Sequence, residues 1–509
     1  MLPQQSHHHA YPQHQQSNYN LAPSYYHHAG SDQAMMMNPQ QEQQQQIKDQ
    51  MMNQQFLEQQ QYDMNDEQQQ QQNYMMDQQE DYATQQQLFM QAQQVNREQV
   101  PFANLQMEYV QYSVNGNTFS LPKRYTMDGV KGSGGFGCVV SAVDNKNNER
   151  VAIKKVSSLW ERDRNYQKRI LREIKILKHF SIHHAHNVVI LKDLFFDPYQ
   201  PGSIYIVTNL MDFDLEKLLS SNQTFSEQSI QYFLHEILKA VNIMHSSNII
   251  HRDLKGMYFI LESQIYSFLD NINIPSNILL NRDLDLQICD FGLSRAIGQD
   301  YPEDSKYVVT RWYRSPEVIL YWNKLHAAMD MWSIGCIFAE LLVKPLHKNG
   351  RPILFPGKDF KDQLELILRL IGTPSNEEVR GCSEGIKFLR TSFKQHYEKK
   401  NFSQVFSHVT NPLAIDLLER MLTWDPEKRI TVQDALKHPY LKEMFDPDEF
   451  NLDPSCNENS YFCKARFDYQ FSEDIKTEDI KVLVEAEVES FQQYIMQQQH
   501  QTHMMDDHH

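Results

Sequence analysis

The pattern of apolar and polar positions changes sharply near residue 121. Beyond it lie the short β-branched runs LPKRYTMDGV, GSGGFGCVVSAV and ERVAIKKV, which surround a glycine-rich turn and predict strands. Residues 165–179 place Ile170, Ile174 and Leu177 on one helical face and Arg and Lys on the other, which predicts an amphipathic helix. The run SIYIVTNL, residues 203–210, then predicts a buried strand.

The rest of the chain is mostly helical in pattern. Four segments carry the helical spacing of apolar positions: QSIQYFLHEILKAVNIMHSS, DMWSIGCIFAELL, KDQLELILRLIG and NPLAIDLLERMLTW. A small β-rich region therefore precedes a larger α-rich one. This order predicts an α+β fold of two lobes, with an antiparallel β-sheet lobe to about residue 211 and a helical lobe from about 212.

The first part of the chain has a composition that is not typical of a folded domain. Eighteen of the forty residues 41–80 are Gln. Such a segment buries too little aliphatic surface to offset the entropy of ordering its backbone. We therefore expect residues 1–120 to be a disordered Gln/Met/His-rich arm, prone to association rather than folding.

The net charge of −17 is unevenly distributed along the chain. Residues 1–110 contribute −10, residues 446–509 contribute −11, and the middle carries +4. A near-neutral body with an acidic end argues against nucleic-acid binding and favours partners with basic segments.

The sequence shows no clear pattern for secretion, membrane insertion or disulfide bonds. We expect no signal peptide, and no apolar run reaches the ~18 residues that a membrane span needs. The six cysteines show no C-x-x-C pair and no disulfide-like spacing, which favours free thiols and a reducing compartment. We therefore expect a cytoplasmic or nuclear protein without membrane contact.

The first motif that carries chemistry is the glycine-rich run GSGGFGCV, residues 132–139. Gly132, Gly134 and Gly137 allow backbone amides to approach phosphate groups closely. A lone G-x-G-x-x-G is weak evidence, because dinucleotide folds also use it. Here a strand follows instead of a helix, and it ends in VAIK, so that Lys154 can reach the same phosphates as a point charge.

The second group of motifs is HRDLK, PSN and DFG, in this order along the chain. Phosphoryl transfer needs an acceptor for a hydroxyl proton, hard oxygen ligands for a metal ion and positive charge near the phosphate. Asp253 suits the first role, Asn277 and Asp290 the second, and Lys255 the third. Glu173 is the natural ion-pair partner for the phosphate-binding lysine, although a helical Glu is more often a solvated surface residue.

These motifs resemble those of the eukaryotic protein kinases over residues 115–493. The resemblance implies a bilobal kinase fold that uses ATP and Mg²⁺. It also implies further nucleotide-binding positions on the strands, at the gatekeeper and hinge, and just beyond them: Val139, Ala152, Thr208, Met211 and Asp214.

Two structural pairs are implied by the same resemblance. SPE, residues 315–317, stands where the family has A-P-E, so Glu317 is expected to pair with Arg429. Asp330 in DMWSIGC matches the aspartate that supports the catalytic loop.

Within the kinases, YVVTRWYRSPEVIL, FPGKDFKDQLELILRLIGTPS and MLTWDPEKRITVQDALKHPYL resemble the mitogen-activated protein kinases. The resemblance implies transfer to Ser or Thr followed by Pro, with a pocket shaped by the loop from Val309 to Arg314, within a signalling cascade.

The resemblance also implies a phosphorylation switch. Members of the family carry a T-x-Y triplet that an upstream dual-specificity kinase phosphorylates; here it reads Ser305-Lys306-Tyr307. Each phosphate adds about −1.5 to −2 charge at pH 7. Three residues match the family's arginine cluster for the first phosphate: Arg172, Arg252 and Arg295.

The C-terminal extension, 446–493, resembles the segment that in these enzymes wraps back onto the small lobe. At its start Asp446, Asp448 and Glu449 match an acidic docking patch for basic motifs on substrates and phosphatases. A solvated acidic loop is the alternative. Residues 494–509 are expected to be a disordered tail.

Nineteen mostly apolar residues, 256–274, separate HRDLK from PSN within the expected kinase domain, 121–445. Three hypotheses stay open: the stretch comes from an unremoved intron, it is a loop extruded from a working enzyme, or it weakens catalysis. A misplacement of catalytic groups by ~1 Å can cost about 10²-fold in rate.

Two alternatives to a mitogen-activated protein kinase remain open. One is a cyclin-dependent-like kinase, which is disfavoured because 165–179 lacks a PSTAIRE-like sequence and Tyr307 occupies the switch triplet. The other is a non-catalytic docking scaffold that acts through the acidic patch and the Gln-rich arm.

Overall fold

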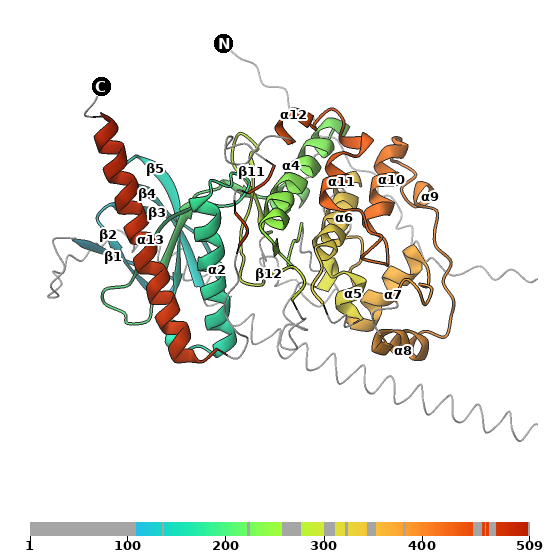
Figure 1. Ribbon diagram of the computed structural model, residues 1–509, viewed down its shortest axis with the longest axis horizontal. Coiled ribbons are helices and arrows are strands. Elements are labelled where there is room, and N and C mark those ends of the chain that lie inside the picture. The colour runs from blue at the N-terminus through green and yellow to red at the C-terminus, as the bar shows by residue number, and fades with distance from the viewer. Residues whose placement is uncertain are drawn as a thin grey trace, which may run out of the picture. The chain divides into compact units, whose positions relative to one another are not determined.

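The computed structural model describes residues 108–134, 137–220, 224–256, 276–299, 311–320, 324–343, 353–379, 383–450, 461–463, 465–467 and 475–506 (Figure 1). Three segments discussed above lie outside these ranges: the Gln-rich arm to residue 107, residues 257–275, which include most of the insert, and the segment 300–310 with the Ser-Lys-Tyr triplet. Within the described ranges, no helix combines the length and apolar character that a membrane crossing requires.

A five-stranded antiparallel sheet forms the first lobe, with the strand order β3-β4-β5-β7-β6. Its strands are β3 (Tyr125–Gly134), β4 (Gly137–Asp144), β5 (Glu149–Val156), β6 (Leu191–Phe196) and β7 (Ile204–Asn209). Side chains alternate between the two faces of a strand. Val151 and Ile153 are buried in the core of the lobe, whereas Ala152 and Lys154 lie on the opposite face. The predicted strands are confirmed.

The folded lobe begins before residue 121. A hairpin of β1 (Tyr109–Val114) and β2 (Asn117–Pro122) precedes the sheet, with Tyr112 opposite Phe119. Phe119 and Leu121 are fully buried in the core of this lobe. The expectation that 109–120 belongs to the disordered arm is therefore corrected, because a composition average over the arm hides this short alternating segment.

The one long helix of this lobe is α2 (Arg164–Ile182). It begins at Asp163, whose side chain accepts a hydrogen bond from the Tyr166 amide and caps the free N–H groups of the first turn. Its buried face includes Ile170, Ile174 and Leu177, as the sequence pattern predicts.

The second lobe is helical. Its helices are α3 (Leu215–Ser220), α4 (Glu227–Ser246), α5 (Pro316–Ile319), α6 (Ala328–Leu342), α7 (Phe360–Ile371), α8 (Ser383–Ser392), α9 (Phe402–Val405), α10 (Pro412–Met421) and α11 (Val432–Leu436). Every residue of α6 is buried, and α6 packs against α4 and α10. The four helices expected from the apolar periodicity are confirmed as α4, α6, α7 and α10.

Short strands position the loops between the two lobes. They are β8 (Phe213–Asp214), β9 (Ile249–Ile250), β10 (Ile278–Leu280), β11 (Leu286–Ile288) and β12 (Arg295–Ala296). They form a three-stranded sheet, β11-β10-β8, and a two-stranded sheet, β12-β9. Ser276 and Asn277 directly precede β10, and the DFG residues 290–292 lie between β11 and β12, so these pairings fix where these residues lie.

The C-terminal extension returns to the first lobe. After the short helix α12 (Pro447–Phe450), residues 461–463 and 465–467 lie against the end of α4. Asn242 of α4 donates to the Tyr461 carbonyl at 2.7 Å, and the Phe467 amide donates to the Ser247 carbonyl at 2.8 Å. The chain ends in α13 (Thr477–Asp506), which packs against α2 and β6 (Figure 1). The helix therefore continues through residues expected to form a disordered tail from 494, because Phe491 and the residues before it provide a buried face that anchors it.

Phe119→Ala tests the hairpin as part of the folded lobe. Removal of a fully buried Phe should lower the free energy of unfolding by about 3 kcal/mol or more. Ser113→Ala, at an exposed position of the same hairpin, should change it by less than about 0.5 kcal/mol. Urea titration of the full chain measures both; equal midpoints for the two variants would place the hairpin outside the cooperative fold.

Candidate active site

The central feature of the site is an ion pair between the sheet and α2. Lys154 Nζ lies 2.7 and 2.8 Å from the two carboxylate oxygens of Glu173. Both side chains are largely shielded from solvent, at 19% and 8% exposure. Burial alone would lower the pKa of Lys154, but the carboxylates of Glu173 and Asp290 outweigh it and raise that pKa above its usual value.

Three further residues predicted to bind the nucleotide share one face of the sheet with Lys154. Val139 of β4 lies opposite Lys154, and Ala152 lies opposite Thr208 of β7. Residues in register project to the same side of a sheet, so these four side chains form a single surface away from the apolar core. Met211 follows β7, half-buried.

The glycine-rich turn closes between β3 and β4. Gly134 lies opposite Gly137, which adopts a φ of +119°, and a Cβ there would collide with the Lys155 carbonyl. Only glycine tolerates both conditions, so the turn depends on this residue. Gly132 has open space around it, and Gly135 and Phe136 lie outside the described residues.

Asp214 lies at the end of β8 and is buried. Its carboxylate accepts a hydrogen bond from the Lys217 amide at 2.9 Å and lies 3.1 Å from Lys217 Nζ. This contact turns the chain into α3 just below the hinge.

Asp330 of α6 supports the catalytic loop from beneath. Its carboxylate accepts hydrogen bonds from the backbone amides of His251 and Arg252, both at 2.8 Å, and from His245 Nε2 at 2.9 Å. Burial would raise the pKa of Asp330, but these hydrogen bonds outweigh it and keep that pKa below its usual value. The predicted role is confirmed. The support is needed because Arg252 has a φ of +73°, a conformation that non-glycine residues rarely adopt.

The residues that flank the insert are hydrogen-bonded directly to each other. Ser276 Oγ donates to the Lys255 carbonyl at 2.8 Å, and the Lys255 amide donates to Asn277 Oδ1 at 3.2 Å. The Asn277 side-chain amide in turn donates to the Asp253 carbonyl. HRDLK and SN therefore form one connected loop although nineteen extra residues separate them in sequence. Residues 257–275 themselves, Pro275 included, lie outside the described residues.

The catalytic acid–base geometry is compact. Lys255 Nζ lies 3.6 Å from Asp253 Oδ2, and both side chains are mostly buried. His251 orients the loop, since its Nε2 donates to the Cys289 carbonyl at 3.0 Å and its Nδ1 accepts from the Asp253 amide.

The DFG segment lies beside this loop. The Cys289 amide donates to the Asn277 carbonyl at 3.0 Å, so the residue that precedes Asp290 is bound to the backbone of the loop. Phe291 is fully buried. Its ring packs edge-on against His251 and at a tilted angle against Phe180 of α2, with centroid distances of 5.5 and 5.8 Å. Phe291 therefore joins the catalytic loop to the helix that carries the catalytic glutamate.

The oxygen donors present fit a divalent metal ion shared with phosphate groups. Asn277 Oδ1 accepts one hydrogen bond and retains a second lone pair, and the charge of Asp290 acts on the nearby Lys154. No group of three or more His, Cys, Asp or Glu side chains in the described ranges could hold a metal alone. A two-residue set needs further oxygen ligands, which suits a metal that retains water and binds phosphate.

The three predicted phosphate-binding arginines converge on one stretch of backbone. Arg172 donates to the Gly292 carbonyl at 2.6 Å, Arg252 to the Leu293 carbonyl at 3.1 Å, and Arg295 to its neighbour's carbonyl at 3.1 Å. All three side chains are buried. The structure thus brings together residues far apart in sequence, while Ser305, Lys306 and Tyr307 lie outside the described residues.

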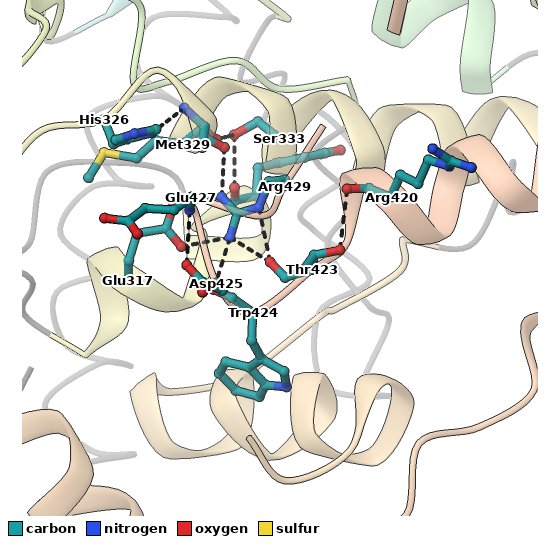
Figure 2. Close-up of polar contacts among 12 residues, drawn as sticks. Glu317, His326, Met329, Ser333, Arg420, Thr423, Trp424, Asp425, Glu427 and Arg429 are labelled. Carbon is teal, nitrogen blue, oxygen red and sulfur yellow. Dashed lines mark hydrogen bonds and ion pairs between the residues drawn. The ribbon is translucent and has the colours of Figure 1, made fainter. Parts of the chain in front are cut away.

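The expected pair of Glu317 and Arg429 is confirmed (Figure 2). Two guanidinium nitrogens donate to the two Glu317 oxygens at 2.6 and 2.9 Å, and both groups are almost fully buried. The remaining donors of Arg429 reach the carbonyls of Ala328 and Thr423. This pair anchors the segment after the activation loop to the helical lobe.

Ser315 is a feature whose environment the sequence does not reveal. The residue is 2% exposed and lines a small pocket together with Arg252, Arg314 and Ser333. It precedes α5 but does not cap it, and its hydroxyl finds no hydrogen-bond partner among the described residues. Substitution of Ser for the family's Ala was visible in the sequence, but its burial depends on α6.

The acidic docking residues lie at the start of the extension. Asp446 and Asp448 are exposed, and Asp446 Oδ1 accepts from the Asp448 amide at 2.8 Å. The side chain of Glu449 lies outside the described residues. Two exposed carboxylates on a short turn leave the docking prediction untested.

The fold and this site together define a protein kinase. The family model described as a protein kinase domain matches residues 125–269 and 274–441. Extracellular signal-regulated kinase 1 of Dictyostelium discoideum is 42% identical over 358 residues, which cover 68% of this chain and 60% of that protein. Mitogen-activated protein kinase 6 of Arabidopsis thaliana is 39% identical over 388 residues, covering 75% and 87%, and mitogen-activated protein kinase 10 of the same plant is 42% identical over 358 residues, covering 69% and 81%.

The chain therefore belongs to the mitogen-activated protein kinases, a family of serine/threonine protein kinases that use ATP and a divalent metal ion.

Glu317→Gln should strongly destabilise the chain, because it leaves the Arg429 charge buried without a counter-charge. We expect a loss of about 3–5 kcal/mol in the free energy of unfolding. Glu398→Gln, at a side chain that is 91% exposed, is the control and should change it by less than about 0.5 kcal/mol. Urea unfolding followed by tryptophan fluorescence measures both, and a loss below 1 kcal/mol would contradict the structural role of the pair.

Ser315→Ala should stabilise the chain by about 1 kcal/mol, since it removes a buried hydroxyl that costs desolvation without a hydrogen bond. Ser333→Ala is the matched control in the same pocket. Ser333 Oγ donates to the Tyr313 carbonyl at 2.9 Å, so its loss should destabilise. Thermal unfolding measures both. Destabilisation by Ser315→Ala would mean that the hydroxyl has a partner within residues 300–310.

Proposed function

We propose that this chain is a proline-directed serine/threonine kinase, activated by phosphorylation of Ser305 and Tyr307, that works within a signalling cascade. The observation that carries the proposal is the connected catalytic loop. Asp253, Lys255 and Asn277 are held together by hydrogen bonds across the insert, beside Asp290 and the Lys154–Glu173 pair.

Each of these residues has its own role in phosphoryl transfer. Asp253 would accept the proton from the substrate hydroxyl as that oxygen attacks the γ-phosphorus of ATP. The bond from the γ-phosphorus to the oxygen that links it to the β-phosphate would break, and ADP would leave. Lys255, 3.6 Å from Asp253, offsets negative charge on the transferred phosphoryl group. Lys154 holds the other phosphates of the nucleotide, and Glu173 fixes the direction of its ammonium group.

Asn277 and Asp290 would hold Mg²⁺. Their hard amide and carboxylate oxygens suit this ion, which prefers a few protein ligands together with phosphate oxygens. A metal ion held there would supply positive charge to offset that of the phosphate groups.

Activation acts through the arginine cluster. Phosphate on Ser305 would replace backbone carbonyls as the acceptor for Arg172, Arg252 and Arg295, because hydrogen bonds between ionised groups are stronger than those to neutral acceptors. The cluster is supported by its convergence on residues 292–294.

Partners follow from the family and from charge. We propose an upstream dual-specificity kinase as activator, and substrates and phosphatases that dock basic motifs on Asp446, Asp448 and Glu449. The two described aspartates are exposed, as such docking requires.

We also propose that the protein works in the cytoplasm or nucleus. The described cysteines are all free thiols, which suits a reducing compartment: Cys138, Cys289, Cys336 and Cys463.

A kinase assay on three purified chains tests the function: the full chain, a variant lacking 256–274, and Lys154→Met. Each is first incubated with an active dual-specificity MAP kinase kinase. Transfer of ³²P from ATP is then measured on a Ser-Pro peptide and on a matched Ser-Ala peptide. We expect the Ser-Pro peptide to be preferred, and Lys154→Met to reduce its rate by about 10²-fold or more.

Each outcome decides one alternative. Transfer no faster than that of Lys154→Met in both other chains would overturn the proposal. Activity in the shortened variant alone would show that the insert blocks catalysis, and the full chain would then be a docking scaffold. Equal rates on both peptides would remove the proline-directed specificity.

A further inference from the structure

The helix that carries the catalytic glutamate is held from both sides. On its inner side Glu173 binds Lys154. On its outer side Glu487 of α13 accepts hydrogen bonds from Lys175 Nζ at 2.8 Å and Lys178 Nζ at 2.7 Å. Figure 1 shows α13 alongside α2, and the two helices are in contact.

The positions along α2 explain this opposition. Each residue turns an α-helix by 100°, so Lys175 lies about 200° and Lys178 about 140° around the axis from Glu173. The two lysines thus lie on the side of α2 away from the ion pair. A contact there resists rotation of the helix about its axis, which is the motion that would withdraw Glu173.

The outer contact is shielded from solvent. The side chains of Lys175, Lys178 and Glu487 are 19%, 18% and 16% exposed. Burial would raise the pKa of Glu487, but the hydrogen bonds from both lysines outweigh it and lower that pKa, so the carboxylate is charged at neutral pH. Partly buried charges are screened less by salt than the exposed pairs of a protein surface.

The same helix also binds the sheet. Gln492 Nε2 donates to Asp193 Oδ1 and to the Leu194 carbonyl, both at 2.7 Å, and both acceptors belong to β6. β6 pairs with β7, which pairs with β5, the strand of Lys154. α13 therefore connects the two elements whose relative position sets the distance from Lys154 to Glu173.

An apolar stripe attaches α13 independently of these charges. Its residues follow a spacing of four, four and three, which places them on one helical face, and all are buried: Ile480, Val484, Val488 and Phe491. Loss of the Glu487 charge should therefore leave the helix docked and the chain folded.

We propose that Glu487 is a positioning residue for phosphoryl transfer: it fixes the rotation of α2 and so keeps Glu173 in contact with Lys154. It acts through α2 and contacts no reacting atom. The proposal rests on the kinase function proposed above, and its test therefore includes a measurement that needs no catalysis.

The test compares Glu487→Gln with Glu489→Gln in the full chain. Gln has the shape of Glu but lacks the charge, and Glu489 is an exposed residue two positions further along the same helix. Hydrogen–deuterium exchange of residues 164–182 reports on α2, and exchange of residues 149–156 reports on β5 as an internal reference. We expect Glu487→Gln to raise exchange in α2 several-fold with β5 unchanged, and Glu489→Gln to resemble the natural chain.

Kinetics supply the second measurement. After activation by the dual-specificity kinase, Glu487→Gln should lower kcat on the Ser-Pro peptide about 10-fold with the peptide KM unchanged, since the loss affects the transition state and not peptide binding. Glu487→Asp keeps the charge and should recover part of kcat. Glu489→Gln should leave both constants unchanged.

The outcomes separate this proposal from the one it rests on. If exchange rises in α2 alone and no variant transfers phosphate, the result supports the contact of Glu487 as the one that holds α2 and overturns the kinase function. If Glu487→Gln leaves exchange in α2 unchanged, the proposed role of Glu487 is overturned. An unchanged kcat of this variant in an active enzyme overturns it as well. A parallel rise of exchange in α2 and β5 would show general destabilisation and would also overturn it.

Discussion

The site depends on one buried ion pair, Lys154 with Glu173, whose members belong to different elements. The removal of each charge from water costs several kcal/mol. The attraction between the two charges offsets this cost only where the two groups are held in close contact. The pair is therefore formed only while α2 stays against the sheet. The packing of Phe291 on Phe180, the arginine contact to Gly292 and the helix α13 all hold α2 there.

A second constraint concerns the catalytic loop. The loop contains an insert that by length alone could separate Asp253 from Asn277. Asp330 holds the backbone before the insert, the pairing of β10 with β11 and β8 holds the chain after it, and Ser276 joins the two sides. Lys255 and Ser276, which flank the insert, are hydrogen-bonded to each other, so the described catalytic groups stay together on either side of it. The geometric objection to a working enzyme therefore does not apply to the described residues.

The C-terminal extension gives the small lobe a partner from within the same chain. Residues 461–463 and 465–467 lie against α4, and α13 lies on α2 and β6. A lobe of one sheet and one long helix has a limited core, and the added apolar stripe of α13 enlarges it. The extension thus belongs to the fold of the catalytic domain, although its sequence is acidic and rich in Gln near its end.

The sequence by itself determined the class of protein and the order of the lobes, and it supplied the residues that we propose for the catalytic site. These follow from local signals: alternation for β4 and β5, helical periodicity for α2, and short motifs in a fixed order. It misjudged the two ends of the folded region, 109–120 and 494–506, because a composition average over a Gln-rich stretch conceals a few apolar residues that gain stability only when a distant surface covers them.

Only the tertiary structure decided which distant groups meet. Glu487 and Lys175 are 312 positions apart, and their contact depends on how the extension crosses the molecule. The burial of Ser315 and the closure of the loop across the insert likewise depend on packing between elements. No local pattern encodes these contacts, because their free energy arises from surfaces that the chain brings together only on folding.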